Sequence, residues 1–127
     1  MSDQVIDALL KERDRLLNLI SRAHSSEYVT IDTKLGAVYR ELGKAYMQSP
    51  VLLPLERLNK AAYYFNMSSA QYDLVNAHAE AAESRRQYEE VLAIYRQITP
   101  LSYPPGGHSG TAQERERISE LLIQHFL

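Results

Sequence analysis

The chain has 127 residues, of which 45% are hydrophobic and 24% are charged, and its formal net charge is −2. A chain of this length fits one domain with a core of its own, and the near balance of charges excludes a general attraction to nucleic acid or anionic membrane. The sequence contains no cysteine, which excludes disulfides, thiol nucleophiles and thiolate metal sites.

The first predicted helix covers residues 3 to 23, within an N-terminal helical segment of residues 1 to 24. Its apolar residues recur every three or four positions, and charged residues occupy the remaining face. The opening residues include acids and contain no long apolar run, so they predict neither a secretory signal nor a membrane span. We therefore expect a soluble, cytoplasmic protein without membrane insertion.

Two helical hairpins are predicted over residues 31 to 98. The first helix of the first hairpin begins near Thr30 or Asp32, because either side chain can cap it, and ends before Pro50. Its partner helix has Pro54 in the first turn, where the missing N–H group costs nothing.

The second hairpin is expected to pair a helix of residues 70 to 83 with a helix of residues 86 to 98. The stretch MSSAQ at residues 67 to 71 is interpreted as the turn between the hairpins. The charged stretch ESRRQ at residues 83 to 87 is interpreted as the corner within the second one.

A loop rich in proline and glycine is predicted over residues 99 to 110, followed by a C-terminal helix of residues 111 to 127. Thr111 and Glu114 form a capping box at the start of that helix. Its apolar side consists of Ile118, Leu121, Leu122, His125 and Phe126. With about six helices and no convincing strand pattern, the chain is predicted to be a single all-α domain of antiparallel helical hairpins.

The stretches ELGKAYM, at residues 41 to 47, and YEEVLAIYRQITP, at residues 88 to 100, resemble parts of the tetratricopeptide repeat. In that family a small residue lies where two helices approach closely, and large residues fill the space between hairpins. The resemblance is degenerate and covers residues 35 to 104. The first stretch matches through Leu42, Gly43 and Tyr46, and the second through Val91, Tyr95 and Ile98.

The resemblance implies an array of helical hairpins whose first helices line a concave groove. By motif position, polar residues of two such helices would point into the groove: Arg40, Lys44, Gln48, Asn76 and Glu80. Two alternatives stay open. The chain could instead be a helical bundle whose apolar stripes form only its core, and each of these polar residues could belong to a solvated helix face.

Tyrosine is unusually frequent, with nine residues in the chain. Tyrosine combines packing area with a polar tip and is common at protein interfaces. Tyr63 and Tyr64 point about 100° apart on one helix, so they cannot both face the same core. At least one is expected to be exposed or at an interface, and Tyr64 is the candidate partner-binding residue.

Residues suited to catalysis or metal binding form no recognisable pattern. The four histidines have no partner at ligand spacing, so no metal or cofactor is expected. The stretch GGHSGT lacks the strand and the second glycine of a nucleophile elbow, because Thr111 stands where that glycine belongs. The acidic residues alternate with basic ones as on a solvated surface.

The sequence therefore predicts a non-enzymatic protein that holds another protein or peptide segment in a helical groove, as an adaptor, a small chaperone or a subunit of a complex. Nucleic acid is not expected as a partner. The alternative is a self-associating structural protein, a homo-oligomer whose terminal helices pair between chains without a peptide groove.

Overall fold

The computed structural model describes residues 3–49 and 52–102. It contains four α-helices in these ranges, with a short 3-10 helix, η1 (Ser25–Glu27), ahead of the second: α1 (Asp3–Ile20), α2 (Tyr28–Met47), α3 (Pro54–Leu74) and α4 (His78–Ser102). No strand occurs in the described ranges, and the predicted all-α class is confirmed for them. The predicted C-terminal helix of residues 111 to 127 lies outside the described residues, as does the predicted loop from residue 103 onward.

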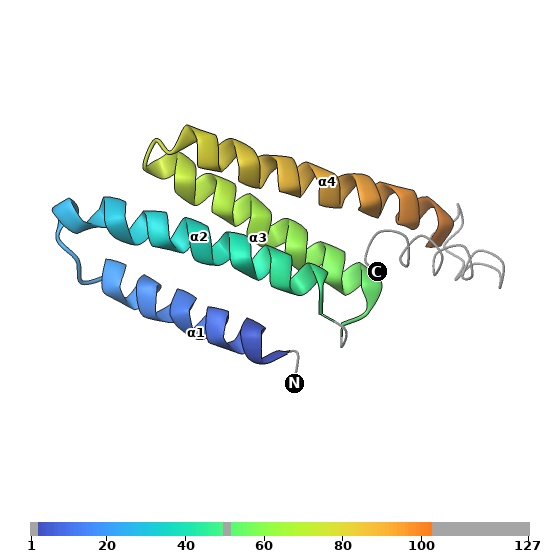
Figure 1. The fold of residues 1–127 in the computed structure, drawn as a ribbon, viewed down its shortest axis with the longest axis horizontal. Coiled ribbons are helices and arrows are strands. Elements are labelled where there is room, and N and C mark those ends of the chain that lie inside the picture. The colour runs from blue at the N-terminus through green and yellow to red at the C-terminus, as the bar shows by residue number, and fades with distance from the viewer. Residues whose placement is uncertain (1–2, 50–51, 103–127) are drawn as a thin grey trace.

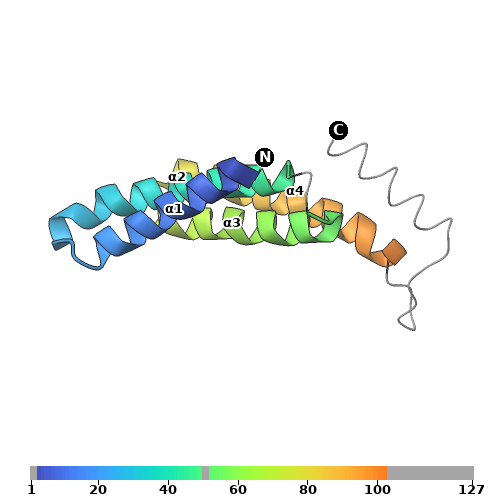
Figure 2. The ribbon, with the colours of Figure 1, turned by 90° about the horizontal axis from the view of Figure 1, so that it is seen from below.

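The four helices lie side by side, each antiparallel to the one before it (Figure 1). α1 and α4 lie on opposite sides of the α2–α3 pair, an arrangement that Figure 2 shows from a second direction. The described part is therefore an open, elongated array in which each helix packs mainly against its neighbours in the chain.

The first two helices were predicted closely, and α3 begins with Pro54 in its first turn as expected. Helix α2 starts two residues before Thr30, so Thr30 and Asp32 lie inside the helix and do not cap it. No described helix combines the length and the apolarity needed to cross a membrane.

The predicted turn at residues 67 to 71 is wrong, because α3 runs through it without a break. Serine disfavours helix interiors when its hydroxyl competes for the backbone of its own helix. Here Ser68 donates its hydroxyl to the backbone oxygen of Gly36 on α2, at 2.7 Å, and is fully buried. A neighbouring helix therefore satisfies the side chain that the sequence alone suggests would end α3.

Helix α3 ends at Leu74, and two residues later comes Asn76, the one described residue other than glycine with a positive φ, at 60°. The Ala77 N–H donates to the Tyr72 oxygen at 2.9 Å, and the Asn76 N–H donates to the Asp73 oxygen at 3.1 Å. These two bonds form a Schellman motif, in which a left-handed residue terminates the helix. Asparagine adopts this conformation more readily than most residues.

The predicted corner at residues 83 to 87 is also wrong, since α4 is continuous there. Arg86 forms ion pairs with Glu83 and Glu90, at spacings of three and four residues that support a helix. α4 also continues one turn beyond the predicted end at Ile98, through Pro100 to Ser102. Proline removes a single backbone donor, which shortens the hydrogen-bond ladder without ending the helix at once.

The core is centred on the contact between α2 and α3. A Cβ atom at Gly43 would lie 2.7 Å from Phe65 Cε1, and one at Gly36 would lie 3.0 Å from Tyr72 Cε2. The two glycines are seven residues apart on α2, as are the two aromatic residues on α3. Each glycine therefore receives one ring, and the absent side chains let the two helices approach closely.

Candidate functional site

Arg40 and Glu80, both predicted to face a partner, hold α2 and α4 together. Arg40 Nε donates to Ser84 Oγ at 3.0 Å, and its two terminal nitrogens donate to the side chain and backbone oxygens of Glu80 at 2.8 and 2.7 Å. Its guanidinium also lies 5.1 Å from the centre of the Tyr72 ring. With the Arg40 side chain only 16% exposed, most of its bonding capacity is used within the chain.

The contacts of Arg40 continue into a buried chain of hydroxyl groups. Ser84 Oγ lies 2.8 Å from Ser68 Oγ, and Ser68 in turn donates to the Gly36 oxygen. Both serines are fully buried. Because buried hydroxyl groups need partners, this chain of hydrogen bonds fixes how α4 sits against α2 and α3. Burial also raises the pKa of the neighbouring Tyr72 phenol, which keeps it neutral.

Tyr64 belongs to the core. Its ring stacks with those of Tyr39 and Tyr46, at centroid distances of 6.0 and 5.4 Å, and its hydroxyl oxygen accepts a hydrogen bond from Arg13 on α1. It is 6% exposed, whereas its neighbour Tyr63 is 58% exposed. One member of the pair is exposed, as predicted, but that member is Tyr63, and Tyr64 has almost no surface to offer a partner.

Asn76 is exposed in the turn between α3 and α4, where its left-handed backbone ends α3. The left-handed backbone by itself explains why an asparagine occupies this position, so no contact with a partner protein is needed to explain it. The structure therefore brings Arg40 and Glu80 together, places Asn76 at the end of the array, and leaves Lys44 and Gln48 as the exposed predicted residues that line a hollow.

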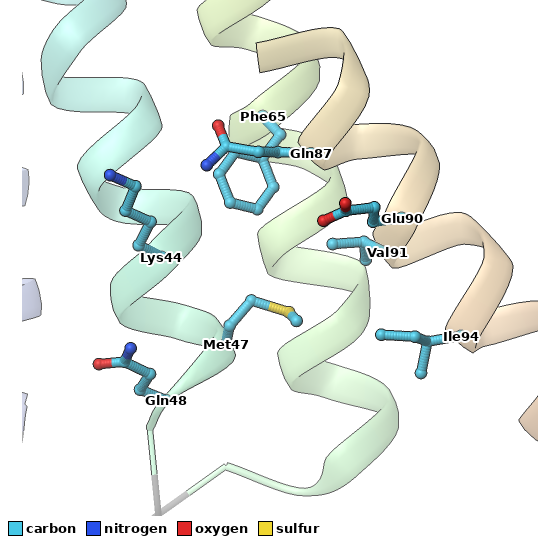
Figure 3. Close-up of a pocket in the computed structure, with 8 residues that line it drawn as sticks. All are labelled: Lys44, Met47, Gln48, Phe65, Gln87, Glu90, Val91 and Ile94. Carbon is cyan, nitrogen blue, oxygen red and sulfur yellow. The ribbon is translucent and has the colours of Figure 1, made fainter. Parts of the chain in front are cut away.

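Lys44 and Gln48 lie on the rim of a hollow of about 260 Å³ between α2 and α4, which we call the α2–α4 groove (Figure 3). Its floor is apolar and is formed by side chains of α2, α3 and α4: Met47, Phe65, Val91 and Ile94. Its rim is polar and includes Lys44 and Gln48 on α2 and Gln87 and Glu90 on α4. In Figure 3 the side chains of Gln87 and Glu90 extend from α4 toward α2, whereas the polar ends of Lys44 and Gln48 point away from α4.

Charges of both signs border the α2–α4 groove. Lys44 Nζ lies 3.4 Å from Glu41, and Glu90 pairs with Arg86; all four side chains are well exposed. The hydrogen bond from Arg86 also lowers the pKa of Glu83 below its usual value. These pairs are accessible and solvated, so a charged partner could exchange with them at small cost.

Gln87 has a buried side-chain oxygen with no hydrogen-bond partner among the described residues. In Figure 3 its amide lies over the Phe65 ring, at the end of the groove. Because this oxygen is buried, the Gln87 amide has to turn before it can accept a hydrogen bond from a molecule in the groove.

A second hollow lies on the other side of Lys44 and Gln48, between α1 and α2. It is lined by the apolar side chains of Val5 and Leu9 on α1 and by Glu41 and Ala45 on α2. The two hollows share Lys44 and Gln48, so this part of α2 forms a ridge with an apolar depression on each side.

The floor of the α2–α4 groove was not recognised from the sequence. Val91 was noted only for its place in the resemblance to the repeat, and none of Met47, Phe65, Val91 and Ile94 was predicted to be a site residue. α2 and α4 are separated in the chain by all of α3, so only the packing of both against α3 reveals that they form one groove.

The described residues contain no group of three His, Cys, Asp or Glu side chains that could hold a metal ion. Comparison of the chain with protein-family models, with curated proteins and with solved structures gives no match.

Proposed function

We propose that this protein is a non-enzymatic binding module that holds an amphipathic helix of another protein in the α2–α4 groove. The observation that supports this function is the apolar floor enclosed by a polar rim, with Lys44 on one wall and Glu90 on the other. Helix-binding grooves take apolar side chains spaced three or four residues apart and leave the polar face of the helix in water.

The charges on the two walls also favour one orientation of the bound helix. A partner helix with an acidic residue on the edge facing Lys44 and a basic residue on the edge facing Glu90 would match both. Such rim charges contribute to specificity and association rate more than to affinity. The partner is therefore a helix with an apolar stripe and opposite charges on its two flanks, as expected for the client of an adaptor, chaperone or assembly subunit.

The resemblance to tetratricopeptide repeats remains part of the proposal for the first hairpin. Gly43 lets α2 and α3 approach closely, which is the role of the small residue in that family. The helices also form an open array. The second repeat unit is not part of it, because α3 and α4 are long single helices without the turns that this unit needs.

The test is capture of a partner from an extract of the source cells by the tagged chain, with the complex sized by light scattering. Ile94→Asp should weaken capture at least about tenfold, because it puts a charge on the apolar floor. Lys44→Glu should weaken capture by a smaller factor, because it reverses a charge on the solvated rim. Lys34→Glu is the matched control, since it makes the same charge change at an exposed position of α2 away from the groove.

Arg40 is unsuitable for this test, because its replacement would loosen α4 and confuse binding with folding. Equal capture by the groove variants and by Lys34→Glu would contradict the proposal. Self-association without any captured protein would favour the alternative, in which terminal helices pair between chains. Leu17 and Leu19 of α1, both more than two-fifths exposed, would be the residues to examine in that case.

A further inference from the structure

Residues 111 to 127 carry the apolar stripe of an amphipathic helix, and they follow α4 closely in the chain. The stripe recurs every three or four residues from Ile118 to Phe126, and the polar residues Glu120 and Gln124 lie between its members. A helix with one apolar face is stable only when that face is covered. This is the kind of helix that the α2–α4 groove suits.

The chain between α4 and this segment is long enough to return to the groove. α4 ends at Ser102, and Ile94, the last groove residue on α4, lies about 12 Å back along the helix axis. Residues 103 to 110 can span up to about 27 Å, and their prolines and glycines favour a change of direction. Helices joined by short connections pack antiparallel, as each pair from α1 to α4 already does.

A segment tied to its own groove also has a large concentration advantage. Short flexible connections give effective concentrations in the millimolar range. If the free helix bound the groove with a dissociation constant of about 0.1 mM, an effective concentration of about 1 mM would leave the groove open for roughly a tenth of the time. An outside helix would then bind about tenfold more weakly than it binds the open groove.

We propose that residues 111–127 occupy the α2–α4 groove of the same chain and compete there with a partner helix. This inference rests on the proposed function, since it takes the groove to be a helix-binding site. In the occupied state Ile118, Leu121 and Leu122 lie on the apolar floor. Partner binding displaces them, so the chain limits its own association until a helix of higher affinity is present.

The absence of cysteine makes a direct test possible, because one introduced thiol is the only thiol. In Met47→Cys the thiol stands on the groove floor, and its rate of reaction with 5,5′-dithiobis(2-nitrobenzoic acid) reports how often the floor is open. Adding Leu121→Asp with Leu122→Asp should raise this rate about tenfold, because two charges on the stripe disfavour the apolar groove.

Gln113→Asp with Gln124→Asp is the matched control. It adds the same two negative charges to the side of the segment opposite the stripe and should leave the rate unchanged. A thiol at Tyr63→Cys, on an exposed part of α3 that does not line the groove, should react at the same rate with every version of the segment. Ile94→Cys repeats the measurement with a thiol on the α4 side of the groove. It replaces Met47→Cys if circular dichroism shows that the Met47→Cys protein is unfolded.

Equal rates for the stripe variant and its control, at the groove thiol, would overturn the proposal. A reaction rate of the groove thiol that falls as the protein concentration rises would also overturn it, since a neighbouring chain would then supply the helix. Either result leaves the proposed function standing, because capture of a partner is tested separately through Lys44 and Ile94.

Discussion

Arg40 and Arg86 both hydrogen-bond to glutamates, but their surroundings differ. Arg86 pairs with Glu83 and Glu90 on the surface of α4, where water screens the charges. Arg40 is largely buried between helices and bonds to Glu80 and to Ser84. The number of ion pairs at a residue therefore does not indicate how much that residue stabilises the fold.

We predict that Arg40→Ala lowers the free energy of unfolding by about 2–3 kcal/mol, because it leaves Ser84 and its neighbours without a charged donor. Arg40→Lys should recover little, since one ammonium group cannot reproduce the three directed bonds. Arg86→Ala should cost less than about 1 kcal/mol. Urea denaturation of the three variants measures these changes in the free energy of unfolding. A larger decrease for Arg86→Ala than for Arg40→Ala would show that the buried contacts of Arg40 are unimportant.

At the scale of the elements, the α2–α3 contact depends on two glycines as much as on apolar residues. Glycine inside a helix normally costs about 1 kcal/mol relative to alanine. Gly36 and Gly43 offset that cost by admitting the rings of Tyr72 and Phe65 against the α2 backbone. The helix is locally weaker so that the pair of helices can pack more tightly.

Gly43→Ala is therefore expected to destabilise the protein by about 1–3 kcal/mol, although alanine is the better helix former, because its Cβ would overlap the Phe65 ring. The reverse change at an exposed site of the same helix, Ala37→Gly, measures the intrinsic helix preference and should cost about 1 kcal/mol. Thermal and urea unfolding provide the comparison. Stabilisation by Gly43→Ala would mean that α2 and α3 are not in close contact there.

At the scale of the whole molecule, the open array makes stability uneven. Among the described helices, α2 and α3 each lie between two others, whereas α1 has a neighbouring helix on one side only. In arrays of this type each element is stabilised by its nearest neighbours, so an end element opens more easily than a central one.

Hydrogen exchange measured by mass spectrometry should show this difference. Backbone amides in the middle of α2 and α3 are expected to exchange at least about tenfold more slowly than those in the middle of α1, which corresponds to a difference of about 1.4 kcal/mol in opening free energy. Equal protection of α1 and α3 would instead indicate a closed bundle that opens as one unit.

The sequence alone determined the all-α class of the described residues, the position of α1, the approximate span of α2 and the start of α3 at Pro54. These features depend on local rules of helical periodicity and proline geometry, which act within a few residues. The same rules failed at Ser68 and Ser84, because those serines bond to other helices and to each other. They also missed Asn76, which ends α3 without the glycine that usually marks such a site.

Only the tertiary structure decided which polar residues remain available to a partner. Arg40, Lys44, Tyr64 and Glu80 all have groups that a binding site could use, and sequence spacing cannot separate them. Packing commits Arg40, Tyr64 and Glu80 to contacts within the chain and leaves Lys44 exposed beside the apolar floor. The physical reason is that this floor joins side chains from three helices, and contacts between distant segments leave no local trace in the sequence.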